Sequence, residues 1–68
     1  MQIVVNGLSK DVPQATTLLT LLDSLNIPLA RVAVELNMNI IDRTQFDKVS
    51  LQEGDRLEVI HFVGGGGE

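Results

Sequence analysis

A leucine-rich segment at residues 16–26, TTLLTLLDSLN, constrains the fold of this chain more than any other stretch. Its leucines recur at helical spacing and predict a helix with one apolar face, formed by Leu18, Leu22 and Leu25 with Leu21 beside them. Thr16 or Thr17 can cap the first turn, and Pro28 ends the helix near Asn26. A lone helix cannot bury an apolar face by itself, so the other residues must supply a packing surface.

Two strand-like segments precede that helix. QIVVN at residues 2–6 is rich in β-branched residues, which favour strands. Asn6-Gly7 follows as the strongest short-range hairpin signal, because both residues tolerate positive φ. LSKDVP at residues 8–13 then returns as a second strand and stops at its proline. The N-terminal part is therefore predicted to be a β-hairpin.

The second half of the chain contains further strands. RVAVELN at residues 31–37 alternates apolar and polar side chains, and RLEVIHF at residues 56–62 is predicted to be the final strand. Between them we expect a short strand at residues 39–41 and a helical turn near Gln45. LQEGD makes a turn at Gly54.

The resulting order, β-β-α-β-(β)-β, predicts an α+β protein with the β-grasp fold, the ubiquitin-like architecture. A small mixed sheet then carries one main helix on one face, with the first and last strands side by side in the middle. We expect one β-grasp domain over residues 1–63 and a flexible glycine-rich tail over residues 64–68. Hydrophobic residues make up 44% of the 68, which is enough for a small packed core.

Strand alternation predicts which side chains the helix covers. The covered set pairs two apolar residues from each central strand: Ile3, Val5, Leu57 and Val59. The opposite face then carries Val4, Ile60 and Phe62 among polar neighbours. Isolated surface hydrophobic residues are common, but Phe62 directly precedes the tail, which favours a partner-docking surface.

The composition excludes several classes of function. With no cysteine and one histidine, His61, the chain lacks the ligands of a metal site, and we expect neither a metal nor a bound cofactor. No serine has a recognisable base, so a self-contained enzyme is not expected. The net charge of −4 disfavours nucleic acid and anionic membranes as partners. With no apolar run of about 18 residues and no basic leader, we expect a cytoplasmic protein. We also expect it to be a monomer.

The second half resembles a known family. VAVELN, then II.R..F, then L.EGDRLEVIHFVGGG are similar to the ThiS family, the bacterial sulfur carriers of thiamine biosynthesis. The resemblance covers nearly the whole chain and is weakest in the first hairpin. It implies that an E1-like adenylyltransferase uses ATP to adenylate a C-terminal glycine carboxylate. It further implies that a sulfur donor system converts this group to a thiocarboxylate, from which thiazole synthase takes the sulfur.

By spacing from the last strand, Gly65 and Gly66 match the glycine pair on which the family commonly ends. Glu68 lies beyond that pair, and if only this residue is lost the reactive terminus is Gly67. Either Glu68 is removed before activation, or it is a remnant of expression, or the chain is not activated in this form.

Two alternatives remain beside the thiamine carrier. The small subunit of molybdopterin synthase has the same fold and a Gly-Gly end, although those chains usually run longer. A ubiquitin-like interaction module without tail chemistry belongs to a different class, in which the glycine run is a plain linker.

Overall fold

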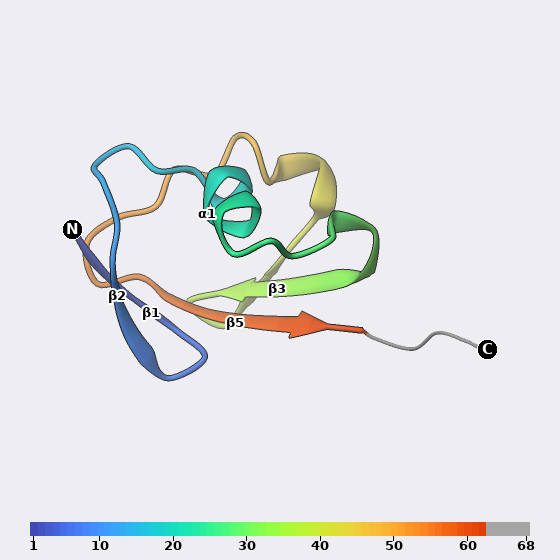
Figure 1. Cartoon of the computed structure of the whole chain (residues 1–68), viewed down its shortest axis with the longest axis horizontal. Coiled ribbons are helices and arrows are strands. Elements are labelled where there is room, and N and C mark those ends of the chain that lie inside the picture. Colours follow the sequence, from blue (N-terminus) through green and yellow to red (C-terminus); the bar gives the residue numbers. More distant parts are fainter. Residues whose placement is uncertain (63–68) are drawn as a thin grey trace.

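The computed structural model describes residues 1–62, and in them a five-stranded sheet carries one α-helix on one face (Figure 1). Two short 3-10 helices, η1 and η2, lie in the connections. The elements in chain order are β1 (Gln2–Val5), β2 (Leu8–Asp11), α1 (Leu18–Ser24), η1 (Leu29–Arg31), β3 (Val32–Leu36), β4 (Asn39–Ile41), η2 (Arg43–Gln45) and β5 (Arg56–His61).

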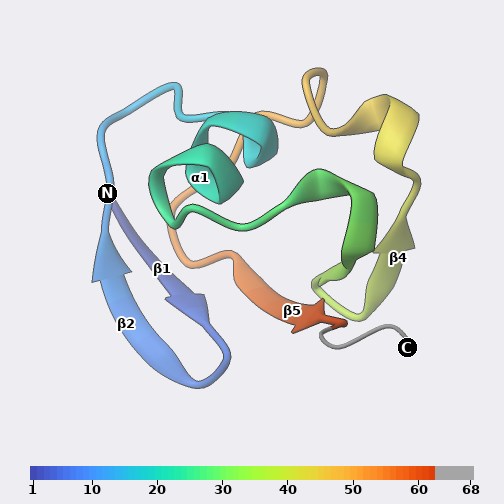
Figure 2. The same ribbon diagram turned by 45° about the vertical axis from the view of Figure 1, so that its right-hand side comes forward.

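The sheet is mixed, and its strand order is β2-β1-β5-β3-β4. β1 and β5, the first and last strands, pair in parallel at the centre, whereas the other neighbours are antiparallel. In Figure 2 the helix lies over one face of this sheet, and no helix or strand of residues 1–62 covers the opposite face. This is the β-grasp topology predicted from the order of the elements, including the short fourth strand.

The first hairpin forms as its Asn-Gly turn predicts. Asn6 and Gly7 both have positive φ, at 49° and 83°, which a two-residue hairpin turn of this kind requires. Asn6 also extends the pairing of the central strands through its side chain. Its Oδ1 accepts from the backbone N–H of Val59 at 2.7 Å, and its Nδ2 donates to the backbone carbonyl of Val59 at 3.1 Å.

The helix begins and ends where the sequence indicates, with one change in the residues that it buries. Thr17 is the N-cap, and its hydroxyl accepts from the backbone N–H of Thr20 at 3.1 Å. Leu18, Leu21 and Leu22 are fully buried. Leu25, predicted as part of the main apolar face, is the C-cap residue and only half-buried, so Leu21 takes its place in the core.

The core lies between the helix and the sheet, as strand alternation predicts. Ile3, Leu57 and Val59 are buried beneath the helix, and Val5 packs half-buried at the margin of the same cluster. Val34 joins them from β3, while Phe46 and Leu51 close the core from the loop before β5.

The EGD turn is held by a buried carboxylate. Gly54 has φ of 84°, a conformation that glycine adopts without strain. Asp55 is buried, and its Oδ2 accepts from the backbone N–H of Gln52 at 2.8 Å. Its Oδ1 accepts from the side-chain amide of Asn37 at 3.0 Å, which links the turn to the β3–β4 hairpin. The most specific part of the sequence motif therefore has a structural role in this domain.

Replacing Asp55 by alanine is expected to reduce the free energy of unfolding by about 1–3 kcal/mol, because the N–H of Gln52 and the amide of Asn37 both lose their acceptor. Urea denaturation measures the loss. Asp47→Ala, at an exposed carboxylate in the loop after η2, is the control and should change the free energy by less than about 0.5 kcal/mol. Equal losses in the two variants would contradict this role.

Candidate functional site

The candidate site begins where the central strand β5 ends. β5 points toward one end of the molecule, away from the N-terminus (Figure 1). Phe62 continues the antiparallel pairing beyond the strand, since its N–H donates to the carbonyl of Arg31 at 2.9 Å. The predicted tail residues Gly65, Gly66 and Gly67 lie outside the described residues. The structure thus describes the chain up to Phe62, the residue that comes just before the tail in the sequence.

The three predicted docking residues lie on the sheet face that is turned away from α1, here called the open face. Ile60 is 51% exposed and Phe62 is 53% exposed, next to the base of the tail. Val4 is half-buried on β1, so it contributes less accessible surface than the other two. Their role in docking remains a prediction.

The sequence reading missed one further apolar residue on this face. Ile40 lies on β4 directly opposite Glu35 of β3 and is 79% exposed. Its neighbour Ile41 pairs with the buried Val34, so the two isoleucines point to opposite faces of the sheet. A short strand at residues 39–41 was predicted, and applying strand alternation to it was the signal that could have placed Ile40.

Metal-ligand groups and membrane-spanning helices are both absent from residues 1–62. No group of three His, Cys, Asp or Glu side chains in this part could hold a metal ion, and His61 is exposed at the end of β5. No helix among these residues is long and apolar enough to cross a membrane.

One titratable group in the described part has a clearly shifted pKa. The Thr44 hydroxyl and backbone N–H both donate to Asp42 Oδ1, at 2.7 and 2.9 Å, and hold the pKa of this carboxyl below its ordinary value. Asp42 is the N-cap of η2, so the shift belongs to a helix cap and not to a reactive centre.

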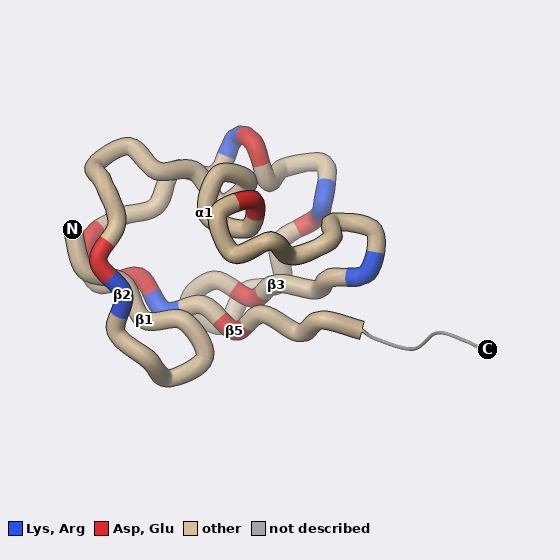
Figure 3. Tube along the Cα trace, in the orientation of Figure 1, with Lys and Arg blue, Asp and Glu red and all other residues tan. Residues whose placement is uncertain are grey.

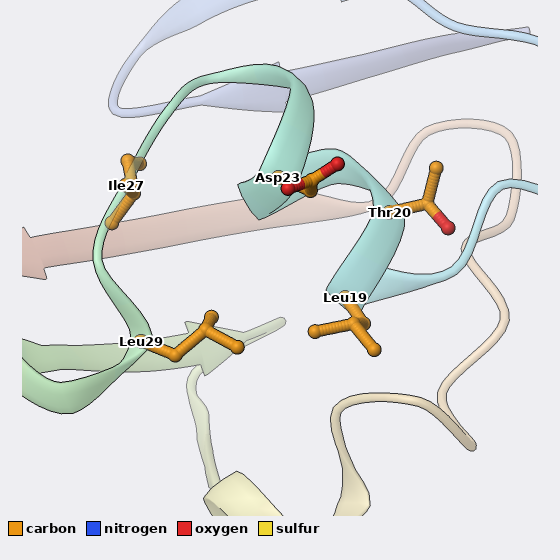
Figure 4. A pocket seen from close by; sticks show the side chains of 5 residues that line it. All are labelled: Leu19, Thr20, Asp23, Ile27 and Leu29. Atoms are coloured by element: carbon orange, nitrogen blue, oxygen red, sulfur yellow. The ribbon is translucent and has the colours of Figure 1, made fainter.

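A hollow of about 320 Å³ lies on the helix side of the molecule (Figure 4). Leucine and isoleucine side chains form most of its wall, and the Thr20 hydroxyl is already hydrogen-bonded to Thr17. Asp23 is the one charged side chain among the residues that line it: Leu19, Thr20, Asp23, Ile27 and Leu29. These five residues contain no nucleophile paired with a base, so the hollow does not form a catalytic site.

Fold and site together define a ubiquitin-like β-grasp protein in which the central C-terminal strand leads directly into a glycine run. The ThiS family model matches residues 3–66. The chain therefore belongs to the ThiS family, the sulfur carriers of thiamine biosynthesis. The predicted resemblance and fold are confirmed, and membership in a family of carrier proteins agrees with the prediction that the chain is not an enzyme.

Individual relatives support this assignment. Sulfur carrier protein ThiS of Bacillus subtilis is 40% identical over 50 residues, which cover 74% of this chain and 76% of that protein. The crystal structure of the thiamine biosynthesis protein ThiS from Geobacter metallireducens superposes with a TM-score of 0.81 at 35% identity, covering 97% of this chain and 100% of that one.

A thiazole synthase of Paramagnetospirillum magneticum is also similar, with 34% identity over 68 residues, which is 100% of this chain. The chain spans only about a fifth of that protein's length, 21%. A domain of this kind thus occurs within a longer protein named thiazole synthase.

Proposed function

We propose that this chain carries sulfur for the thiazole ring of thiamine on the carboxylate of a glycine in its C-terminal run, in a form that lacks Glu68. Membership in the ThiS family, with the matched region extending into the glycine run, is the observation that carries the proposal. The family match also favours thiamine over the molybdopterin alternative.

The proposed reaction activates a poor electrophile. The glycine carboxylate attacks the α-phosphate of ATP in an E1-like enzyme, pyrophosphate leaves, and an acyl-adenylate forms. Hydrosulfide-level sulfur supplied by the donor system then attacks the carbonyl carbon, AMP leaves, and the product is the thiocarboxylate. The chain has no cysteine, so sulfur is carried on the main-chain terminus and not on a side chain.

Glycine suits this role because it lacks Cβ, so the backbone can approach an enclosed active site closely and adopt φ values that other residues avoid. From residue 63 to residue 67 an extended chain spans at most about 18 Å, enough to enter a cleft while the domain stays outside. Thiazole synthase is the proposed acceptor, and the cytoplasm is the proposed compartment. The similarity to a protein of that name supports the acceptor.

Intact-mass measurement tests the proposal directly. A chain that ends at Gly67 is incubated with ATP, its E1-like enzyme and a sulfur source, and we expect the mass increase of one oxygen replaced by sulfur. The same mixture without ATP is the control. No mass change with a competent enzyme would leave the chain as an interaction module.

The open face is the proposed docking surface for the E1-like enzyme, and Phe62→Asp is expected to weaken that association about tenfold or more. Phe62 is 53% exposed beside the tail, so the charge disrupts an apolar contact without entering the core. Titration calorimetry measures binding, and circular dichroism checks the fold. Unfolding of the variant would place Phe62 in the core, and unchanged binding would remove it from the interface.

A further inference from the structure

The open face combines exposed apolar side chains with a pair of like charges. Ile40 on β4 and Ile60 on β5 are exposed, the first directly opposite Glu35 and the second two residues from Glu58. Glu35 is directly opposite both Ile40 on one side and Glu58 on the other. Ile60 lies two residues after Glu58 on the same strand, and therefore on the same face.

The two glutamates face each other across the central β3–β5 pair. The register pairs them directly, and Figure 3 shows an acidic position on each of the two strands. Directly opposite side chains of a sheet have Cβ atoms about 4.5–5.5 Å apart, and like charges there are destabilising. Within the described residues the ion pair that forms joins the terminal amino group to Asp11. Arg56 lies on the same face, yet it has no ion pair with either glutamate.

These positions restrict what can cover the face. A partner surface that covers both Ile40 and Ile60 crosses β3 at Glu35, the residue opposite Ile40, and lies next to Glu58, two residues before Ile60. Burying a carboxylate without a compensating charge costs free energy. An entirely apolar partner would therefore lose more binding free energy at the glutamates than it gained from the apolar contacts. A guanidinium or ammonium group placed between the two side chains removes the repulsion and supplies hydrogen bonds to both carboxylates.

We propose that the open face binds a protein surface that inserts one arginine or lysine side chain between Glu35 and Glu58. Apolar side chains of the partner surround this basic group and contact Ile40 and Ile60. This inference rests on the proposed function, in which the partner is the E1-like enzyme. It adds the chemistry of the contact, which is one basic side chain surrounded by apolar side chains.

The test compares two charge-neutral variants with a matched control. Glu35→Gln and Glu58→Gln remove one charge each at nearly constant shape, and Asp47→Asn removes one charge from the loop on the helix side of the sheet. Binding of the full chain to its E1-like enzyme is measured by calorimetry at low and high salt. We expect each glutamine variant to bind about tenfold more weakly than the parent, with a smaller salt dependence of binding. The control should keep the affinity and the salt dependence of the parent.

The stability of the free chain gives a second readout with the opposite sign. Each glutamine variant should unfold at a higher urea concentration than the parent, because the cross-strand repulsion is gone. Weaker binding together with higher stability supports the proposal, since a merely structural role would not lower affinity while raising stability.

Three outcomes overturn it. Unchanged affinity in both glutamine variants overturns the basic contact alone and leaves the carrier function standing. Failure of the parent chain to bind the E1-like enzyme overturns the proposed function and this inference together. Stabilisation of the parent chain by a divalent cation, absent from both variants, would assign the pair to a metal ion and also overturn it.

Discussion

A chain that ends at Gly66 or Gly67 is expected to support pyrophosphate exchange with its E1-like enzyme at least about a hundredfold better than the chain that carries Glu68. The carboxylate must reach the α-phosphate of ATP at bonding geometry inside an enclosed site. Glu68 adds a side chain and a second carboxylate at that point, whereas glycine leaves the backbone free to fit. Exchange is measured on chains that end at Glu68, Gly67, Gly66 and Gly65.

The same assay separates chemistry from stability at the tail. In a chain that ends at Gly67, Gly66→Ala is expected to lower exchange or sulfur transfer strongly. The tail is predicted to lie outside the folded domain, so the free energy of unfolding should change by less than about 0.5 kcal/mol. Equal exchange with and without Glu68 would show that trimming is not required. If a competent enzyme supported no exchange with any chain, the carrier proposal would fail.

Leu22→Ala is expected to reduce the free energy of unfolding by about 2–5 kcal/mol, which is a large part of the stability of so small a domain. Leu22 has 0% of its surface exposed and lies in the centre of the helix face that packs on the sheet. The truncation removes buried apolar surface and leaves a cavity that the short helix can fill only partly. Urea or thermal denaturation, followed by circular dichroism, measures the loss.

Leu8→Ala provides the matched control for that variant. It makes the same truncation at a side chain that is 74% exposed on β2, where the loss should stay below about 0.5 kcal/mol. A loss at Leu22 as small as the loss at Leu8 would contradict the assignment of this helix face to the core.

Local signals in the sequence were sufficient for most of the fold. The Asn6-Gly7 turn, the leucine spacing of α1 and the alternation in β3 and β5 each depend on residues that are close in the chain. Such signals predict the kind of element and the side that each residue takes, because both follow from backbone geometry alone. The order of the elements then predicts the β-grasp fold, in which one helix is buried against one sheet. The parallel β1–β5 pair confirms this fold.

The candidate site was predictable in part. Ile60 and Phe62 were placed on the open face by counting along one strand, and both are exposed there. Their function is not tested by the fold, and the tail residues lie outside the described part of the chain. Leu21, predicted beside the main apolar face, is fully buried. Leu25, predicted on that face, packs half-buried against the core because the helix ends at Ser24 and Leu25 is its C-cap.

The sequence by itself determined the elements, the face of each strand residue and the family to which the chain belongs. Only the tertiary structure decided which residues of different strands meet: Asp55 with Asn37, Asn6 with Val59, and Glu35 with Glu58. Each of these contacts joins residues at least 18 positions apart in sequence. They depend on strand order and register, which the burial of the whole core fixes and no short stretch of the chain specifies.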